Sequence, residues 1–377
     1  MKKIAKLTWL HNGNFGSVLQ AAALQRYLVE QGYDVTDLDY NASLIEKLKN
    51  WLKNKNSPKL FLGKFEEAKR KKSYKDSDKF IERGKRFSEF EDRWIKRSKL
   101  CRTPKEIEEE SKKYDIFICG SDQIWSPALM NPVFYLNFVS NKKKKIAYAP
   151  SFGVTSTTFG KEKQITEYLK TFSNISVRES QGQQFIEKLT GEKVPVVIDP
   201  TLLLDAKIWS EYTIAPNQEN NYIFCYLLTP NNDYLHAVSK FAKEKGLKVV
   251  IIPTSKGPFE TGFEEIIEIG PAEWLGLIKN ASYVFTDSFH GCIFSSIFHR
   301  EFVLFKRFKD KDKSSENSRI YTLARMLDVE DRIIDEKNVN EIEKLEVIDF
   351  KKIDTIIENR AKESKDWLLK ALKEVGA

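Results

Sequence analysis

The sequence of 377 residues predicts an α/β protein in which two Rossmann-like domains face each other across a cleft. Short β-branched and aromatic runs alternate with helical segments along the chain, the pattern that builds parallel sheets. The alternation stops between Pro200 and Pro216 and then resumes. We therefore expect an N-terminal domain at 1–205, a C-terminal domain at 206–348 and a C-terminal helix at 349–377.

The first series of elements begins with a βαβ unit. Residues 4–10 predict a strand, residues 17–32 a helix that ends at Gly32, and residues 33–40 the next strand. Four further apolar runs, with helical segments between them, extend this sheet at residues 115–119, 145–150, 175–177 and 194–198.

The second series predicts another parallel sheet after the break. Again alternating with helices, its strands are expected near 222–228, 248–252, 282–286 and 302–305. Apolar residues recur at helical spacing over 350–374, which predicts one long helix there. Two such domains across a cleft form the arrangement of the glycosyltransferase B fold, and the cleft is the default ligand site.

Positive charge is concentrated in one part of the chain. Residues 41–113 hold 23 lysines and arginines against 13 acidic residues, although the whole chain has a formal net charge of only +8. Aromatic residues are spread through this segment, so we expect a basic helical insertion in the N-terminal domain. Its charge suits a phosphorylated substrate, an acidic lipid surface or a nucleic acid, and a solvated helical face is the alternative. Of these partners, we expect no nucleic acid.

One predicted helix in the basic segment is amphipathic. Leu44, Ile45, Leu48, Trp51 and Leu52 fall on one face of it, beside three lysines. A helix of this kind can lie on an anionic membrane surface. We expect peripheral membrane contact here, and the alternative is that the apolar face packs on the protein itself.

The spacing of the cysteines and the length of the apolar runs indicate in which cellular compartment the protein is expected. The four cysteines, at positions 101, 119, 225 and 292, show no short pair spacing, so neither a zinc site nor a disulfide framework is predicted. The start, MKKIAKLTWLHNG, lacks the apolar core of a secretion signal, and no stretch approaches the ~18 apolar residues of a membrane span. We expect a cytoplasmic protein, membrane-peripheral at most, without a bound metal.

The segment HNGNFGSVLQ, residues 11–20, joins the first strand to the first helix. Its glycines allow backbone amides to approach a ligand and Ser17 can cap the helix, so we expect Asn14, Gly16 and Ser17 to bind substrate. The segment lacks the G-x-G-x-x-G fingerprint of dinucleotide binding and a P-loop lysine. A simple tight turn is the alternative.

Polar residues follow the strand expected at 115–119. They stand at its carboxyl end, which is where open α/β sheets bind ligands. We expect Gly120, Ser121 and Gln123 to contact sugar hydroxyls and Asp122 to act as a base. A capping role is the alternative for Asp122.

The stretch FTDSFHGCIFSSIF, residues 285–298, places His290 between an apolar strand and an apolar helix. A histidine titrates near neutral pH, and the start of a helix offers amides to an anion. We therefore expect His290 to be catalytic, with Ser288 and Gly291 binding substrate beside it.

Two arginines are candidate clamps for an anionic substrate. Arg178 closes a strand and Arg319 opens a helix, and a guanidinium can hold a carboxylate or phosphate at two points. The alternatives are a structural ion pair between Arg178 and Glu179, and a surface position for Arg319. Asp199, before Pro200, is interpreted as a turn residue.

Seven motifs occur along the chain in a fixed order: NFGSVLQAAAL, CGSDQIW, YAPSFG, ISVRES, VIDPTLLL, DSFHG and NSRIYTL. In this order the chain resembles the polysaccharide pyruvyl transferase family over most of residues 1–330. The resemblance implies a transferase that moves the pyruvyl unit of phosphoenolpyruvate onto two hydroxyls of a cell-surface glycan precursor, leaving a ketal and free phosphate. It implies a lipid-linked or polymeric sugar acceptor, and no cofactor beyond the donor substrate.

The resemblance places the family's donor-site histidine at His290. Several relatives have an arginine two residues earlier, where this chain has Ser288, so Arg319 or Arg178 can replace it, or the donor can differ. In this chemistry His290 supplies the acid or binds phosphate, and Asp122 is the base. Two alternatives stay open: a glycosyltransferase that uses a nucleotide-sugar on the same fold, and a non-catalytic protein that binds anionic glycans.

Overall fold

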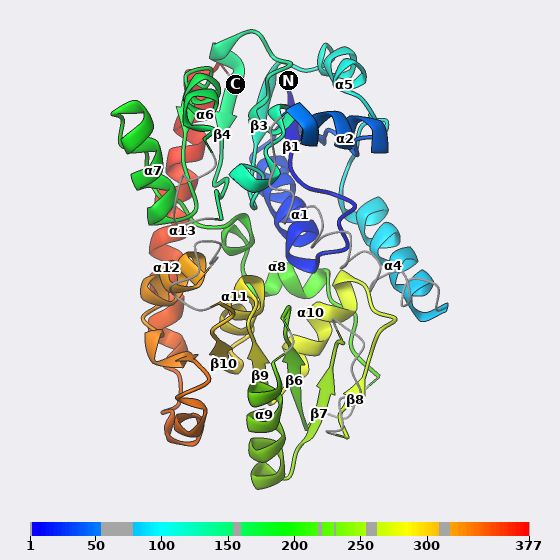
Figure 1. The fold of residues 1–377 in the computed structure, drawn as a ribbon, viewed down its shortest axis with the longest axis vertical. Coiled ribbons are helices and arrows are strands. Elements are labelled where there is room, and N and C mark those ends of the chain that lie inside the picture. The colour runs from blue at the N-terminus through cyan, green and yellow to red at the C-terminus, as the bar shows by residue number, and fades with distance from the viewer. Residues whose placement is uncertain are drawn as a thin grey trace.

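Two parallel sheets lie one above the other, each flanked by helices, in the computed structural model of the chain (Figure 1). The predicted α/β class with two Rossmann-like halves is therefore confirmed. The structure describes residues 2–53, 78–153, 160–217, 221–229, 231–253, 262–308 and 317–376.

The upper sheet has the strand order β2-β1-β3-β4-β5, and every neighbouring pair is parallel. Its strands are β1 (Lys3–Leu7), β2 (Asp34–Asp37), β3 (Ile116–Cys119), β4 (Lys145–Ala147) and β5 (Asn174–Ile175). The helices of this half are α1 (Phe15–Glu30), α2 (Leu44–Lys53), α4 (Asp78–Trp94), α5 (Pro104–Ser111), α6 (Glu162–Leu169) and α7 (Ser180–Thr190).

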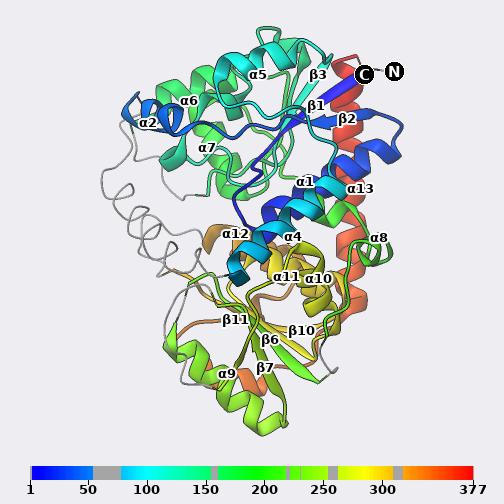
Figure 2. The same ribbon diagram turned by 90° about the vertical axis from the view of Figure 1, so that its right-hand side faces the viewer.

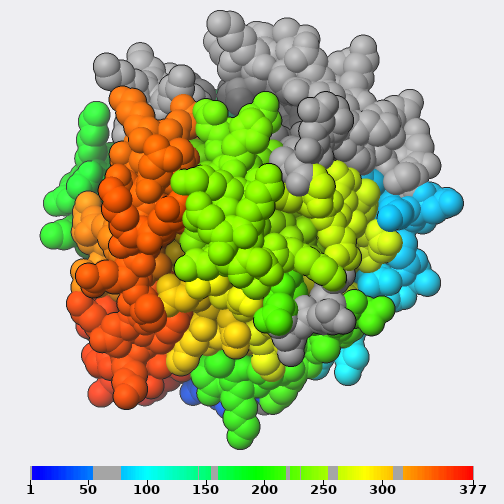
Figure 3. Space-filling view, turned by 90° about the horizontal axis from the view of Figure 1, so that it is seen from below, coloured from blue at the N-terminus to red at the C-terminus, as the bar shows by residue number. Residues whose placement is uncertain are grey.

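The lower sheet has the order β11-β10-β9-β6-β7-β8, again all parallel. Its strands are β6 (Tyr222–Tyr226), β7 (Lys248–Ile251), β8 (Glu264–Glu265), β9 (Tyr283–Thr286), β10 (Glu301–Phe305) and β11 (Ile333–Ile334). Its helices are α8 (Ala206–Glu211), α9 (Asn232–Lys245), α10 (Pro271–Asn280), α11 (Phe289–Ile297), α12 (Asn317–Leu327) and α13 (Phe350–Glu374). From below, α9 lies beside the segment after β11 (Figure 3), where Lys240 Nζ is 2.6 Å from Glu343 Oε1.

The long helix α13 runs along both halves of the molecule (Figure 1). Near its start, Asp354 Oδ1 lies 2.9 Å from Nε2 of His299, which follows α11 in the lower half. Further along, Ser364 Oγ accepts a hydrogen bond from the Ile198 amide, and the ring of Trp367 contacts that of Tyr148, just after β4. The tail helix therefore ties the two halves together.

The halves also share an apolar core around Phe15, the first residue of α1. Its fully buried ring stacks on Trp274 of α10, with centroids 5.4 Å apart and planes 11° apart. Phe87 of α4 and Tyr226 of β6 complete the cluster. Helix α4 packs against both α1 and α10 at this junction (Figure 2), so part of the basic segment is structural.

The strand predicted at 194–198 is wrong. Only an isolated bridge joins Val177 to Val196. The side chain of Gln183 donates to the Val194 carbonyl, Arg360 donates to that of Val196, and Ser364 Oγ accepts the Ile198 amide. Side chains of α7 and α13 thus take the backbone groups that a strand would need for a ladder.

Three further outcomes concern the remaining elements. The two-residue strands β8 and β11 were not predicted, because an apolar period cannot show over two residues. The basic segment is helical in α2, α4 and α5, as expected, while its residues 54–77 lie outside the described part. No helix within the described ranges is long and apolar enough to cross a membrane.

Replacing Phe15 with alanine should lower the free energy of unfolding by about 3–5 kcal/mol, because it leaves a cavity between the two halves. Urea denaturation at equilibrium measures the loss. The control is Val347→Ala, whose side chain is 85% exposed and which should change stability by less than about 0.5 kcal/mol. Equal stability of the two variants would show that the stacked rings do not join the halves.

Candidate functional site

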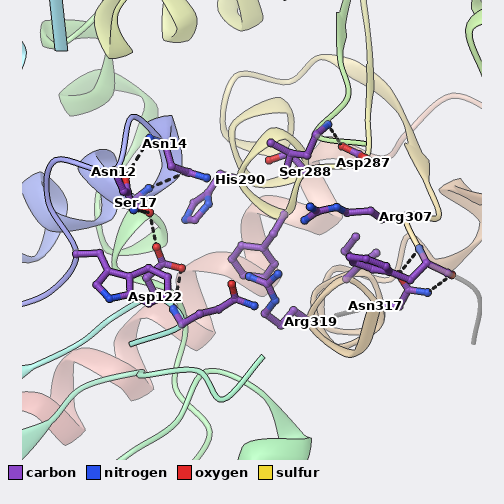
Figure 4. Close-up of a pocket in the computed structure, with 16 residues that line it drawn as sticks. Asn12, Asn14, Ser17, Asp122, Asp287, Ser288, His290, Arg307, Asn317 and Arg319 are labelled. Atoms are coloured by element: carbon purple, nitrogen blue, oxygen red, sulfur yellow. Dashed lines mark hydrogen bonds between the residues drawn. The ribbon is translucent and has the colours of Figure 1, made fainter. Parts of the chain in front are cut away.

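The candidate site is a cavity of about 100 Å³ in the cleft between the two sheets (Figure 4). The loops after β1 and β3 supply its upper wall, and the segments after β9 and β10 supply its lower wall. These are carboxyl ends of parallel strands, which is where such sheets place ligand sites. Seven residues predicted from the sequence line it together: Asn14, Ser17, Asp122, Gln123, Ser288, His290 and Arg319.

His290 stands on the first turn of α11, as the sequence predicts. Ser288 caps this helix, because its Oγ accepts a hydrogen bond from the Gly291 amide at 3.3 Å. The His290 side chain is 9% exposed, and its Nε2 lies 3.6 Å from Asp199 Oδ2, an ion-pair distance too long for a hydrogen bond. The neighbouring residue from the upper half is Gly16, where an added Cβ would lie 1.9 Å from His290 Nδ1.

Asp199 is a functional candidate that the sequence analysis missed. Its Oδ1 accepts hydrogen bonds from the amide and hydroxyl of Thr201, the turn-type cap that was expected. Its Oδ2 lies 2.6 Å from Nη1 of Arg178, so it is also an ion-pair partner, and Arg178 pairs with Asp199 rather than forming the alternative pair with Glu179. Burial would raise the pKa of Asp199, but His290 and Arg178 outweigh it and hold the pKa below its usual range.

Asp122 comes from the opposite wall of the cavity. The Ser17 hydroxyl donates to its Oδ2, the Gln123 amide donates to its Oδ1 at 2.8 Å, and Nη2 of Arg178 lies 3.7 Å away. Ser17 is held in turn by Asn12, whose Nδ2 donates to the Ser17 hydroxyl at 3.0 Å. A carboxylate in this network can accept a proton from a bound hydroxyl.

Five predicted residues do not line this cavity: Gly16, Gly120, Ser121, Arg178 and Gly291. Gly120 has a φ of +118° and an added Cβ would lie 2.0 Å from the Tyr148 carbonyl oxygen, so it is required for packing. Ser121 is fully buried and its hydroxyl donates to the Ala149 carbonyl. The Gly291 amide is used by the cap of α11. Arg178 lines an adjoining hollow instead, which Arg319 shares.

Several lining residues were missed: Trp9, Asn12, Asp287, Arg307, Phe308 and Asn317. Arg307 lies two residues after the end of β10, so its place at the carboxyl end of a predicted strand was an available signal. Its Nε donates to Thr229 Oγ1 at 2.8 Å, and in Figure 4 its side chain lies between Ser288 and Asn317. Arg307 therefore stands near the position where an arginine was expected and Ser288 was found.

Asp287 has a structural role beside the cavity. Its carboxylate accepts the amides of Leu228 and Thr229 at 2.6 and 2.9 Å, which ties the segment after β9 to the segment after β6. Burial raises its pKa to about 6, although these amides oppose the rise.

His11 supports the loop that carries Asn12 and Asn14. Its Nε2 lies 2.6 Å from Asp39 Oδ1 and its Nδ1 lies 3.4 Å from Glu91 Oε2. The hydrogen bond to Asp39 raises the pKa of His11 above its usual value, against the effect of partial burial. The cleft itself combines an imidazole, three carboxylates and several guanidinium groups, which can bind an anion and transfer protons.

Metal ligands and thiols are not part of this arrangement. Among the residues that the structure describes, no group of three or more His, Cys, Asp or Glu side chains could hold a metal ion. The four cysteines are all buried and free, and burial raises the pKa of the Cys292 thiol to about 12.

A family model described as polysaccharide pyruvyl transferase matches residues 14–307. Among solved structures, a UDP-N-acetylglucosamine 2-epimerase has 12% sequence identity, covers 100% of this chain and 96% of its own, and has a TM-score of 0.52. The UDP-GlcNAc 2-epimerase from Methanocaldococcus jannaschii has 10% identity, covers 92% of both chains, and has a TM-score of 0.50. These two likenesses show a shared glycosyltransferase B-like fold alone. No curated protein matches the chain in sequence.

Replacing Gly16 with alanine should displace the His290 ring, because the new methyl group would overlap Nδ1. Helix propensity favours alanine by about 1 kcal/mol, so the fold should survive. Proton NMR of the four histidines measures the effect, and the chemical shift of the His290 ring protons should change. The matched control is Gly84→Ala in α4, where a Cβ meets nothing within 4 Å. An unchanged His290 signal in the Gly16 variant would contradict the contact.

Proposed function

Because the chain belongs to the polysaccharide pyruvyl transferase family, a family of transferase enzymes, we propose that it transfers the pyruvyl group of phosphoenolpyruvate onto two hydroxyls of a sugar. The products are a cyclic ketal and free phosphate, and the acceptor is a lipid-linked or polymeric precursor of a cell-surface glycan. The observation that carries the proposal is the position of His290 at the wall of a polar cavity, opposite Asp122 and beside the buried Asp199.

The proposed reaction begins with a proton transfer to carbon. His290 donates a proton to the methylene carbon of phosphoenolpyruvate, which leaves positive charge on the carbon that bears the phosphate. One sugar hydroxyl attacks this carbon and gives its proton to Asp122. The carbon–oxygen bond to phosphate then breaks, and the second hydroxyl closes the ring, losing its proton to the departing phosphate.

The donor carries a carboxylate and a phosphate, so two anionic groups must be held. Arg307 and Arg319 both line the cavity and supply guanidinium donors for them. Ser288 carries no positive charge, and its side chain caps α11. We propose that Arg307 supplies the positive charge that several relatives have at the position of Ser288. Arg178 is a positioning residue. It pairs with Asp199, and Asp199 in turn lies beside the His290 imidazole, so Arg178 offsets the negative charge next to His290.

Replacing His290 with glutamine should lower turnover by about 10²–10⁴-fold, the usual cost of losing acid catalysis. The thermal midpoint should move little, because glutamine leaves no large cavity. Release of phosphate from phosphoenolpyruvate in the presence of sugar acceptors measures turnover. The matched control is His236→Gln on the exposed face of α9. Near-normal turnover would exclude His290 as the acid, and Asp122 would be the next candidate.

Ligand-induced stabilisation separates the three functions. Phosphoenolpyruvate should raise the melting temperature, as any ligand of the native state does. Stabilisation by a nucleotide-sugar instead would favour the glycosyltransferase. Stabilisation by neither, but by an anionic glycan, would favour the binding protein.

We further propose a cytoplasmic location with peripheral membrane contact through α2. Among the residues that the structure describes, four apolar side chains of this helix are largely exposed, which supports the proposal: Leu44, Ile45, Leu48 and Leu52 are 84%, 67%, 49% and 62% exposed, while Trp51 is half-buried. Lysines 47, 49 and 53 of the same helix complement an anionic lipid surface.

The double variant Leu44→Ser, Leu48→Ser should bind vesicles that contain phosphatidylglycerol much more weakly than the unmodified chain. Co-sedimentation measures binding, which should also fall as salt rises and be absent with neutral lipid. The control is Val347→Ser, another highly exposed apolar position. Equal vesicle binding by all variants would contradict membrane contact. So would a dimer of the chain that persists at high salt and buries the apolar face of α2.

A further inference from the structure

A second hollow of about 350 Å³ adjoins the proposed catalytic cavity. Its walls come from the start of α7, the segment before Pro200, and helices α12 and α13. It shares Phe289 and Arg319 with the catalytic cavity. Four arginines line it against two carboxylates: Arg178, Arg319, Arg325 and Arg360, with Glu179 and Asp199.

We propose that this hollow binds the diphosphate ester that carries the acceptor sugar. The inference rests on the proposed function, because it assigns a place to the second substrate of the same reaction. A diphosphate in the hollow would direct the attached sugar past Phe289 toward His290 and Asp122.

Arg178 provides the deepest anion contact. Its side chain is 2% exposed, and Nη1 pairs with Asp199, while Nε and Nη2 make no hydrogen bond. Buried guanidinium donors without acceptors are costly, so a ligand oxygen that accepts from them is favoured. The guanidinium also lies 4.5 Å above the Phe289 ring, which fixes its plane at the border of the two cavities.

The start of α7 adds a second, independent feature. Glu179 is the N-cap residue of this 11-residue helix, but its side chain caps no amide. Its Oε1 is occupied by the Ser151 hydroxyl and the Phe152 amide instead. Because Glu179 and Ser180 both line the hollow, the positive end of the helix is presented there to a ligand anion.

Two further arginines stand at the rim on different helices. Arg325 of α12 is 74% exposed and pairs with Glu330 at 3.2 Å. Arg360 of α13 is 35% exposed and pairs with Glu363 at 2.5 Å. The pair of Arg325 is exposed and therefore weak, so this guanidinium can turn to a phosphate at little cost. Arg360 also donates from Nη2 to the Val196 carbonyl, so it can meet a phosphate only with the donors that this bond leaves.

The remaining wall is apolar. It is formed by aliphatic and thioether side chains and one ring: Val196, Val197, Ile198, Leu202, Leu323, Met326 and Phe289. A simple phosphate would leave this surface wet, whereas an ester with an apolar or planar group would cover it. The shared chemistry is therefore a diphosphate ester, of either a prenyl chain or a nucleoside.

Isothermal titration with three probes tests the assignment: inorganic pyrophosphate, geranyl diphosphate and UDP. We expect the unmodified chain to bind at least one ester more tightly than pyrophosphate. The double variant Arg325→Gln, Arg360→Gln should bind that ester about tenfold or more weakly, because it lacks hydrogen bonds from charged groups to the diphosphate. The control is Lys370→Gln, which removes an exposed charge from the same helix as Arg360.

Binding of phosphoenolpyruvate is measured in parallel and should change less than about twofold in the double variant, since neither arginine lines the catalytic cavity. Preference for geranyl diphosphate would identify a prenyl carrier, and preference for UDP a nucleotide carrier. Esters that bind the double variant and the unmodified chain equally, or no binding of any probe, would overturn the inference. If an ester binds the unmodified chain more tightly than the double variant but phosphoenolpyruvate does not bind at all, the inference holds and only the proposed donor is refuted.

Discussion

One buried carboxylate, Asp199, holds the centre of the cleft together. It is fully buried, yet it keeps its charge because Arg178, His290 and the Thr201 amide compensate for lost water. Arg178 follows β5 of the upper sheet, whereas His290 belongs to α11 of the lower half. The charge of Asp199 therefore links the two halves at the point where chemistry is proposed, and removal of one partner of a buried ion pair typically costs about 3–5 kcal/mol.

The two halves approach each other closely beside Asp199 because α1 begins with an aromatic ring that stacks and a glycine without a side chain. Gly16 leaves room for the His290 ring, and Phe15, the preceding residue, lies flat on Trp274 of the lower half. The first turn of α1 thus carries a packing contact and a site contact in consecutive residues. Because protein interiors are close-packed, the imidazole has little freedom to turn away from Asp199.

Charge is distributed differently over the three surfaces discussed above. The proposed catalytic cavity pairs cations with carboxylates, which would suit the small donor with two anionic groups that we propose. The adjoining hollow has more arginines than carboxylates and an apolar wall, which suits a larger ester. Helix α2 lines neither of them, and within the described part of the chain four of its apolar side chains are exposed beside lysines. A soluble donor, a carrier-linked acceptor and a membrane surface would each meet a matching region of the same chain.

The α/β class, the two series of parallel strands and the loops that carry His290, Asp122 and Ser17 could all be predicted from the sequence. These features depend on local periodicity and on residues at the ends of strands, which a linear pattern contains. It did not reveal the loss of the strand at 194–198, because side chains of α7 and α13, far away in the chain, take up its backbone groups. Nor did it reveal that Asp199 joins Arg178 to His290, or that Arg307 reaches the cavity. These contacts emerge in the folded chain alone, because each of them joins segments that are brought together by packing rather than by spacing along the chain.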